Sequence, residues 1–184
     1  MYKDILITQL NDFVFCPASI YFHMLYGDTE RVLYQSEKQL NGTKAHETID
    51  MHKYTSKNII TGLDVYCEEF SLVGKIDMYD VQKQMLIERK RMVKQIYDGY
   101  IYQVYAQCLA MREMGYPVKE IKIHSIVDNK DFDISLPVDN PEMYQKFVKN
   151  IEEIKNFKLE EFVQDNKTKC LNCIYESAYD RTLV

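Results

Sequence analysis

Two carboxylates and a lysine stand at spacings that suit the hydrolysis of a phosphate ester. Asp77 closes a Gly-x-x-Asp run, and Glu88-x-Lys90 begins eleven residues later. Glu88 and Lys90 are two residues apart in a predicted strand, so their side chains share one face. Two carboxylates at one sheet edge can bind Mg²⁺ or Mn²⁺ through oxygen ligands. Such a cation would activate a water, and Lys90 would hold that water or stabilise the transition state.

Two further motifs can join this site. His46 ends a Gly-x-x-x-His run upstream and offers a neutral nitrogen ligand. Gln103 and Gln107 are four residues apart, so they share one face of a helix, where their amides could contact a phosphate or the attacking water. Each motif alone also has an ordinary structural explanation, because Glu-x-Lys pairs are common on solvated strands and paired glutamines suit the polar side of a helix. The functional interpretation depends on the whole series.

The elements that position these residues alternate between helix and strand. Apolar residues recur at helical spacing in segments 8–15, 18–25, 36–54, 98–114 and 141–157. Short runs rich in valine, isoleucine, leucine and tyrosine predict strands over 62–70, 72–79, 85–90, 118–127 and 131–136. The first three strands are expected to be antiparallel, with Asp77 ending the second of them. The order predicts a mixed α/β (α+β) fold with elaborations at both ends.

Composition limits the class of protein further. The chain has 184 residues, of which 46% are hydrophobic and 28% charged, so one domain with a substantial core is expected. The net charge of -5 argues against a protein that coats nucleic acid by charge alone, but a local basic strip suffices for DNA contacts. The start of the chain lacks a signal-peptide pattern, and no apolar run approaches the ~20 residues of a membrane span. We therefore expect a cytoplasmic protein with no membrane partner.

Five cysteines raise a separate question about metal binding. An odd number in a reducing compartment disfavours a disulfide framework. Cys170 and Cys173 form a Cys-x-x-Cys pair, and Cys16 lies in a Cys-Pro step near the other end. This pair has the spacing of metal ligands or of a redox site, but no βαβ pattern surrounds it. Cys67 and Cys108 fall in a predicted strand and helix, where a free cysteine is usually a small buried hydrophobe.

Basic and aromatic residues follow the Glu-x-Lys strand. Arg89, Arg91 and Lys94, together with Lys83 and Lys90, could track a DNA backbone or could simply be solvated. Four of the 15 tyrosines gather around the glutamine helix, at positions 97, 100, 102 and 105. Some of these could stack on unpaired bases, although most tyrosines at such spacing pack with the hydroxyl reaching outward.

The ordered motifs ending in His46, Asp77, Glu88-x-Lys90 and Gln103, combined with the terminal cysteines, resemble the CRISPR-associated RecB-like adaptation exonuclease family. This family is the fourth of the numbered Cas proteins, and the likeness is greatest to members from type V loci. It covers nearly the whole chain and implies a PD-(D/E)xK, restriction-endonuclease-like core sheet flanked by helices. The parts would be a helical N-terminal part over 1–59, a nuclease core over 60–160 and a cysteine tail over 161–184.

The resemblance also implies roles for individual residues. His46, Asp77 and Glu88 would bind the metal, Lys90 would be catalytic and Gln103 would assist. Gln107 stands where the family usually has tyrosine. We assign it to DNA contacts, together with Arg89, Arg91 and Lys94. In the family one N-terminal and three C-terminal cysteines hold a [4Fe-4S] cluster. Here Tyr179 replaces the last of them, which leaves three outcomes open: a cluster with another fourth ligand, a zinc ion, or no metal.

The function implied is that of a metal-dependent DNA exonuclease that processes DNA ends, or prespacers, during CRISPR spacer acquisition. Its substrates would be single-stranded overhangs, and selection of the motif that flanks the protospacer would be a further role. Its partners would be the CRISPR integrase and the small companion subunit of that integrase. Two alternatives are a non-catalytic DNA-binding or assembly subunit and a repair-type exonuclease unconnected with CRISPR.

Overall fold

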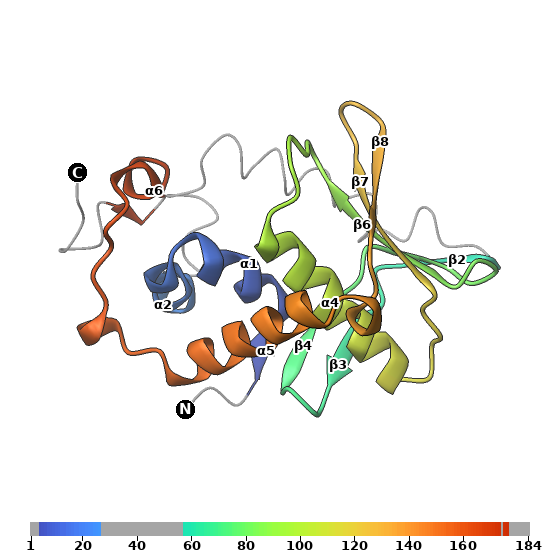
Figure 1. The fold of residues 1–184 in the computed structure, drawn as a ribbon, viewed down its shortest axis with the longest axis horizontal. Helices are drawn as coiled ribbons and strands as arrows, with labels where there is room; N and C mark the ends of the chain where they lie inside the picture. Colours follow the sequence, from blue (N-terminus) through green and yellow to red (C-terminus); the bar gives the residue numbers. More distant parts are fainter. Residues whose placement is uncertain (1–3, 27–56, 174, 177–184) are drawn as a thin grey trace.

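A computed structural model of the chain describes residues 4–26, 57–173, 175 and 176. The expected mixed α/β class is confirmed, with two β-sheets and helices packed against them (Figure 1). The predicted helix over 36–54, His46 and Tyr179 lie outside the described residues. No helix within the described part of the chain is long and apolar enough to cross a membrane.

The larger sheet has five strands in the order β2-β5-β6-β7-β8. Their bounds are Ile59–Thr61 for β2, Met78–Asp80 for β5, Met85–Lys90 for β6, Glu120–Ser125 for β7 and Lys130–Ile134 for β8. Only the central pair β6 and β7 is parallel, and the other neighbours are antiparallel. Parallel strands require a crossover connection, and here helix α4 (Asp98–Glu113) supplies it.

The smaller sheet has three strands in the order β1-β4-β3, with bounds Ile5–Leu6, Leu72–Lys75 and Asp64–Cys67. Strand β1, which was not predicted, runs parallel to β4. The N-terminal segment is therefore part of the core and not only an elaboration of it.

The strand predicted over 72–79 is wrong as one element, because it divides between the two sheets. β4 ends at Lys75, β5 begins at Met78, and the chain bends between them. The segment beside it bends at the same place, where Gly62 has a φ of 64°, a conformation that favours glycine. The backbone N–H of Ile76 donates to Leu63, and that of Gly62 donates to Asp77. Asp77 thus lies in a bend between strands, not at the end of one.

The helices begin and end close to the predicted positions. Their bounds are Ile7–Phe15 for α1, Pro17–Tyr26 for α2, Asp98–Glu113 for α4, Pro141–Asn156 for α5 and Lys167–Leu171 for α6. Cys16 separates α1 from α2 in an extended conformation, as expected for a residue before proline. Helix α6 was not predicted.

Helix α4 lies at the centre of the fold, between α1, α5 and strands of both sheets (Figure 1). Val104, Tyr105, Ala106 and Cys108 are consecutive or nearly so, and all are fully buried. Because α4 contacts other parts of the core on all sides, its buried residues are not confined to one apolar stripe. Phe147 of α5 closes the core with aromatic contacts to Phe70, Tyr102, Tyr105 and Tyr144.

Gly99 sets the distance between α4 and α1. A Cβ atom at this position would lie 2.5 Å from Oδ1 of Asn11 and 3.0 Å from its Cα. Gly99→Ala should therefore lower the free energy of unfolding by about 1–3 kcal/mol. Helix propensity alone predicts the opposite sign, a gain of up to about 1 kcal/mol. Urea unfolding distinguishes the two, and Asn11→Ala combined with Gly99→Ala should recover part of the loss. Unchanged or higher stability of Gly99→Ala would contradict the close contact.

Candidate functional site

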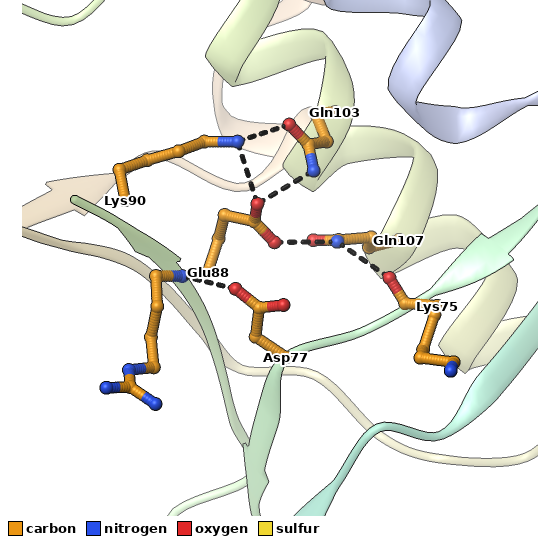
Figure 2. A network of polar contacts seen from close by, with 7 residues as sticks. Lys75, Asp77, Glu88, Lys90, Gln103 and Gln107 are labelled. Carbon is orange, nitrogen blue, oxygen red and sulfur yellow. Dashed lines mark hydrogen bonds and ion pairs between the residues drawn. The ribbon is translucent and has the colours of Figure 1, made fainter. Parts of the chain in front are cut away.

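The bend between the two sheets places Asp77 beside strand β6. Its carboxylate is 8% exposed, and Oδ2 accepts the backbone N–H of Arg89 at 2.7 Å (Figure 2). Because Met78 pairs with Ile87, the preceding Asp77 stands next to Glu88 across the two strands. A backbone donor to the carboxylate fixes its orientation without using a side chain.

Strand β6 presents Glu88 and Lys90 on the face that α4 covers, as their spacing predicts. Glu88 is 1% exposed, and its Oε1 lies 2.8 Å from Nζ of Lys90. The side chain of Lys90 is 20% exposed, so its ammonium group lies between the buried carboxylate and the surface. This buried ion pair is the centre of the polar network in Figure 2.

Two glutamines of α4 complete the network, one helical turn apart. Gln103 bridges the ion pair: its Nε2 donates to Oε1 of Glu88 and its Oε1 accepts from Nζ of Lys90, both at 2.7 Å. Gln107 donates to Oε2 of Glu88 at 2.8 Å and lies 3.2 Å from the carbonyl of Lys75. Both carboxylate oxygens of Glu88 therefore accept hydrogen bonds, as a buried charge requires.

The structure thus brings together four of the predicted site residues, Asp77, Glu88, Lys90 and Gln103. Gln107 joins them, but not in the expected way. It is completely buried and its amide orients Glu88, while the DNA contact stays a prediction. The i, i+4 spacing identified the shared face correctly, but only the packing of α4 shows that this face is covered.

Charges in the network act on one another strongly. Burial raises the pKa of Glu88, Asp77 adds to this rise, and Lys90 and Gln107 oppose it. Burial also disfavours the ammonium of Lys90, but the charge and hydrogen bond of Glu88, with the charge of Asp77, outweigh this effect and raise the pKa of Lys90. Lys90 therefore remains a cation near neutral pH.

The donor set fits a hard divalent cation. Asp77 and Glu88 bring two like-charged carboxylates together in a buried place, and oxygen ligands are those that Mg²⁺ and Mn²⁺ prefer. Within residues 4–26, 57–173 and 175–176, no three histidine, cysteine, aspartate or glutamate side chains form a complete metal site. His46, the expected third ligand, belongs to the segment that is not described.

The predicted basic strip is not continuous. Arg89 points away from α4 and lines a groove on the other face of the sheet, with Lys122 and His124 of β7. Lys83 lies at the far end of β6, where its Nζ is 3.9 Å from Asp80. Arg91 and Lys94 are exposed in the loop that follows Lys90. Of the residues in the predicted basic strip, Arg91 and Lys94 are the two that follow Lys90 along the chain and are exposed.

A further carboxylate near the site was missed by the sequence reasoning. Asp12 lies on α1, where burial raises the pKa of its carboxyl group and the charges of His23 and Lys90 lower it. Asn11 and Asp12 stand between Leu10 and the apolar residues 13–15, and this polar pair was the available signal. It was insufficient because only the packing of α1 on α4 brings Asp12 within range of Lys90.

Three cysteines from the two terminal parts of the chain meet at one cavity. Cys16, Cys170 and Cys173 line one cavity of about 10 Å³, and Nε2 of Gln164 donates to Sγ of Cys16 at 3.3 Å. Burial raises the pKa of Cys173, and the neighbouring thiols Cys16 and Cys170 raise it further. Tyr175 covers the group by stacking on Phe22, with ring centroids 5.9 Å apart.

These cysteines supply one thiol fewer than a four-iron cluster usually takes. Three thiols line the cavity, and four thiolates normally hold such a cluster. Within the described residues, the three thiols also do not form a ready metal site. The three outcomes left open by the sequence, a cluster with another fourth ligand, a zinc ion or no metal, stay predictions, and the three-thiol lining disfavours the first of them. Cys67 and Cys108 lie elsewhere in the core, and burial raises the pKa of each thiol to about 11, in agreement with the expected packing role.

Comparison with known proteins gives evidence on the fold alone. No family model matches the chain, and no curated protein matches it. Among the solved structures that match, one described as the crystal structure of SSO0001 has a TM-score of 0.68. The alignment covers 100% of this chain and 89% of that chain at 15% sequence identity. The chain therefore shares its overall α/β architecture with a solved protein.

Burial of Glu88 makes the stability of the metal-free protein depend on pH. A carboxyl group whose pKa is raised in the folded state contributes most below its unfolded value, near 4.5, and this contribution is lost as pH rises through the folded pKa. Glu88→Gln removes the titration. The free energy of unfolding of this variant, relative to the unaltered protein, should therefore increase as pH rises from about 4.5. Urea unfolding in a chelator measures it, and parallel pH profiles would contradict the raised pKa.

Metal analysis tests the cysteine cavity. We expect protein purified without oxygen to contain no stoichiometric acid-labile sulfide, because the cavity presents three thiols and a [4Fe-4S] cluster normally takes four. One zinc ion per chain that is lost in Cys170→Ser would identify a single-ion site. Iron and sulfide in cluster proportions would show that the expectation is wrong.

Proposed function

We propose that the chain is a metal-dependent nuclease that hydrolyses phosphodiester bonds in DNA, built on a PD-(D/E)xK core. The single observation that carries the proposal is the buried network in which Asp77, from the bend before β5, meets Glu88 and Lys90 of β6, with Gln103 joining the last two. Structural ion pairs rarely bring two carboxylates together in a buried place, because like charges raise the cost of burial. Such an arrangement is typical of a functional site.

In this proposal Asp77 and Glu88 hold the cation. When bound, a divalent cation supplies an activated water and neutralises charge on the scissile phosphate. Asp77 is already oriented by the N–H of Arg89, and Glu88 by Gln103 and Gln107. Ligands held in place before binding lose little conformational freedom when the cation arrives.

Lys90 stabilises the negative charge that develops on the phosphate oxygens during attack. Its raised pKa keeps it protonated, and its partial exposure allows the ammonium group to reach a bound phosphate. Gln103 positions this ammonium group by accepting a hydrogen bond from Nζ at its Oε1. A fixed donor in a site with little water stabilises the transition state more than a mobile surface lysine does.

The finer assignment is also a proposal. We propose that the substrates are DNA ends with single-stranded overhangs, processed as prespacers before integration, and that the CRISPR integrase and its small companion subunit are the partners. The support is the ordered motif series together with cysteines that meet from the two chain ends. Arg91 and Lys94, exposed beyond Lys90, are suited to contact the DNA backbone.

Cleavage of a duplex with a 3′ overhang tests the proposed chemistry. Asp77→Ala removes a metal ligand and Lys90→Ala removes the transition-state cation, so each should lower Mn²⁺- or Mg²⁺-dependent cleavage by at least about 10²-fold. Asp133→Ala and Lys146→Ala, which remove an exposed carboxylate and an exposed ammonium group elsewhere, should retain full activity. Circular dichroism should show that all four variants are folded.

Two outcomes would count against the proposal. Full activity of both site variants would refute the assignment of the residues. Binding of DNA without cleavage under several metals would favour a non-catalytic subunit that retains the fold for recognition.

A further inference from the structure

A half-exposed aromatic ring packs on the tyrosine that lies beside the proposed catalytic lysine. Tyr97 precedes α4 and is 49% exposed. Its ring packs edge-on against Tyr100, with centroids 5.6 Å apart and planes at 90°. Nζ of Lys90 lies over the ring of Tyr100, 5.3 Å from its centroid. An aromatic pair therefore extends from Lys90 to the surface of the protein.

The loop that carries Tyr97 is held at both ends. The backbone N–H of Val93 donates to Oγ of Ser125 at 3.0 Å, and that of Val127 donates to the carbonyl of Arg91 at 3.0 Å. Val93 itself is buried. At the other end, the close contact of Gly99 fixes the start of α4 against α1. The position of Tyr97 relative to Lys90 is thus set before any ligand binds.

Core packing does not account for this tyrosine. Tyr102 and Tyr105, on the same helix, are buried against Phe147 and serve the core. Tyr97 is in contrast exposed. The loop before it carries two exposed cations, Arg91 and Lys94. Proteins bind single-stranded nucleic acid with cations that contact its phosphate backbone and with aromatic rings that stack on its bases.

We propose that Tyr97 stacks on an unpaired base of the DNA end that is being cut, with Tyr100 supporting its ring from the side of Lys90. This inference rests on the proposed nuclease function and names the feature by which that site selects its substrate. A base within a duplex is stacked and paired on both sides, and freeing it costs a few kcal/mol. An unpaired base offers its face at no such cost. Tyr97 therefore favours single-stranded ends.

An abasic scan of a single-stranded oligonucleotide tests the stacking. With the unaltered protein, one abasic position near the cut should lower the cleavage rate by roughly 5- to 150-fold, the range that base–aromatic stacking covers. Tyr97→Ala should lower the rate on the intact oligonucleotide by a similar factor and should abolish the sensitivity to that abasic position. Tyr97→Phe and Tyr97→Trp keep an aromatic face and should retain both properties.

Tyr66 provides a matched control. It is also 49% exposed, but it lies on β3 in the other sheet. Tyr66→Ala should cleave at the unaltered rate and keep the abasic sensitivity. If Tyr97→Ala behaves like Tyr66→Ala, the stacking proposal is overturned.

A binding measurement separates this inference from the nuclease proposal. Fluorescence of an oligonucleotide that contains 2-aminopurine falls when that base stacks, and it needs neither metal nor cleavage. Quenching by the unaltered protein that is lost in Tyr97→Ala supports stacking, whether or not the protein cleaves DNA. If quenching occurs but no metal gives cleavage, only the nuclease proposal is refuted. Cleavage with no quenching at any position, or quenching unchanged in Tyr97→Ala, overturns the stacking and leaves the nuclease proposal intact. If the protein shows no cleavage and no quenching, both proposals are overturned.

Discussion

Burial of the Glu88 carboxylate under α4 is the constraint on which the rest of the structure depends. A carboxylate that is 1% exposed needs a hydrogen bond or a cation at each oxygen, and removal of one partner of a buried pair costs several kcal/mol. Lys90, Gln103 and Gln107 meet that need. Helix α4 must therefore pack on β6 in the one position and orientation that bring both glutamines to Glu88. Helices α1 and α5 then cover other sides of α4.

The bend between the two sheets is the second requirement of the site. A straight strand over 72–79 would carry Asp77 in one continuous sheet, whereas the observed bend lets its carboxylate accept the N–H of Arg89. Gly62 permits the matching bend in the adjacent segment. Bends and irregular pairings are common next to active sites because they redirect a side chain at small cost to the sheet. The proposed catalytic group thus depends on an interruption of regular structure.

Much of the site follows from local periodicity. A two-residue spacing puts Glu88 and Lys90 on one face of a strand, and a four-residue spacing puts Gln103 and Gln107 on one face of a helix. Both expectations are confirmed by the network they form. Sequence reasoning went wrong where the outcome depended on distant residues. It did not foresee the burial of Gln107, it joined β4 to β5, and it had no means of placing Asp12 near Lys90.

The sequence by itself determined which side chains share a face of their own helix or strand, where Cys16 and Pro17 separate two helices, and which residue types could do phosphate chemistry. Only the tertiary structure decided which faces meet, that Gln107 is buried against Glu88, and that Tyr97 stays exposed while Tyr105 is buried. The physical reason is that backbone geometry repeats over a few residues and so appears in local spacing. Burial and electrostatic contact join residues far apart in the chain, and they arise only when the whole core packs.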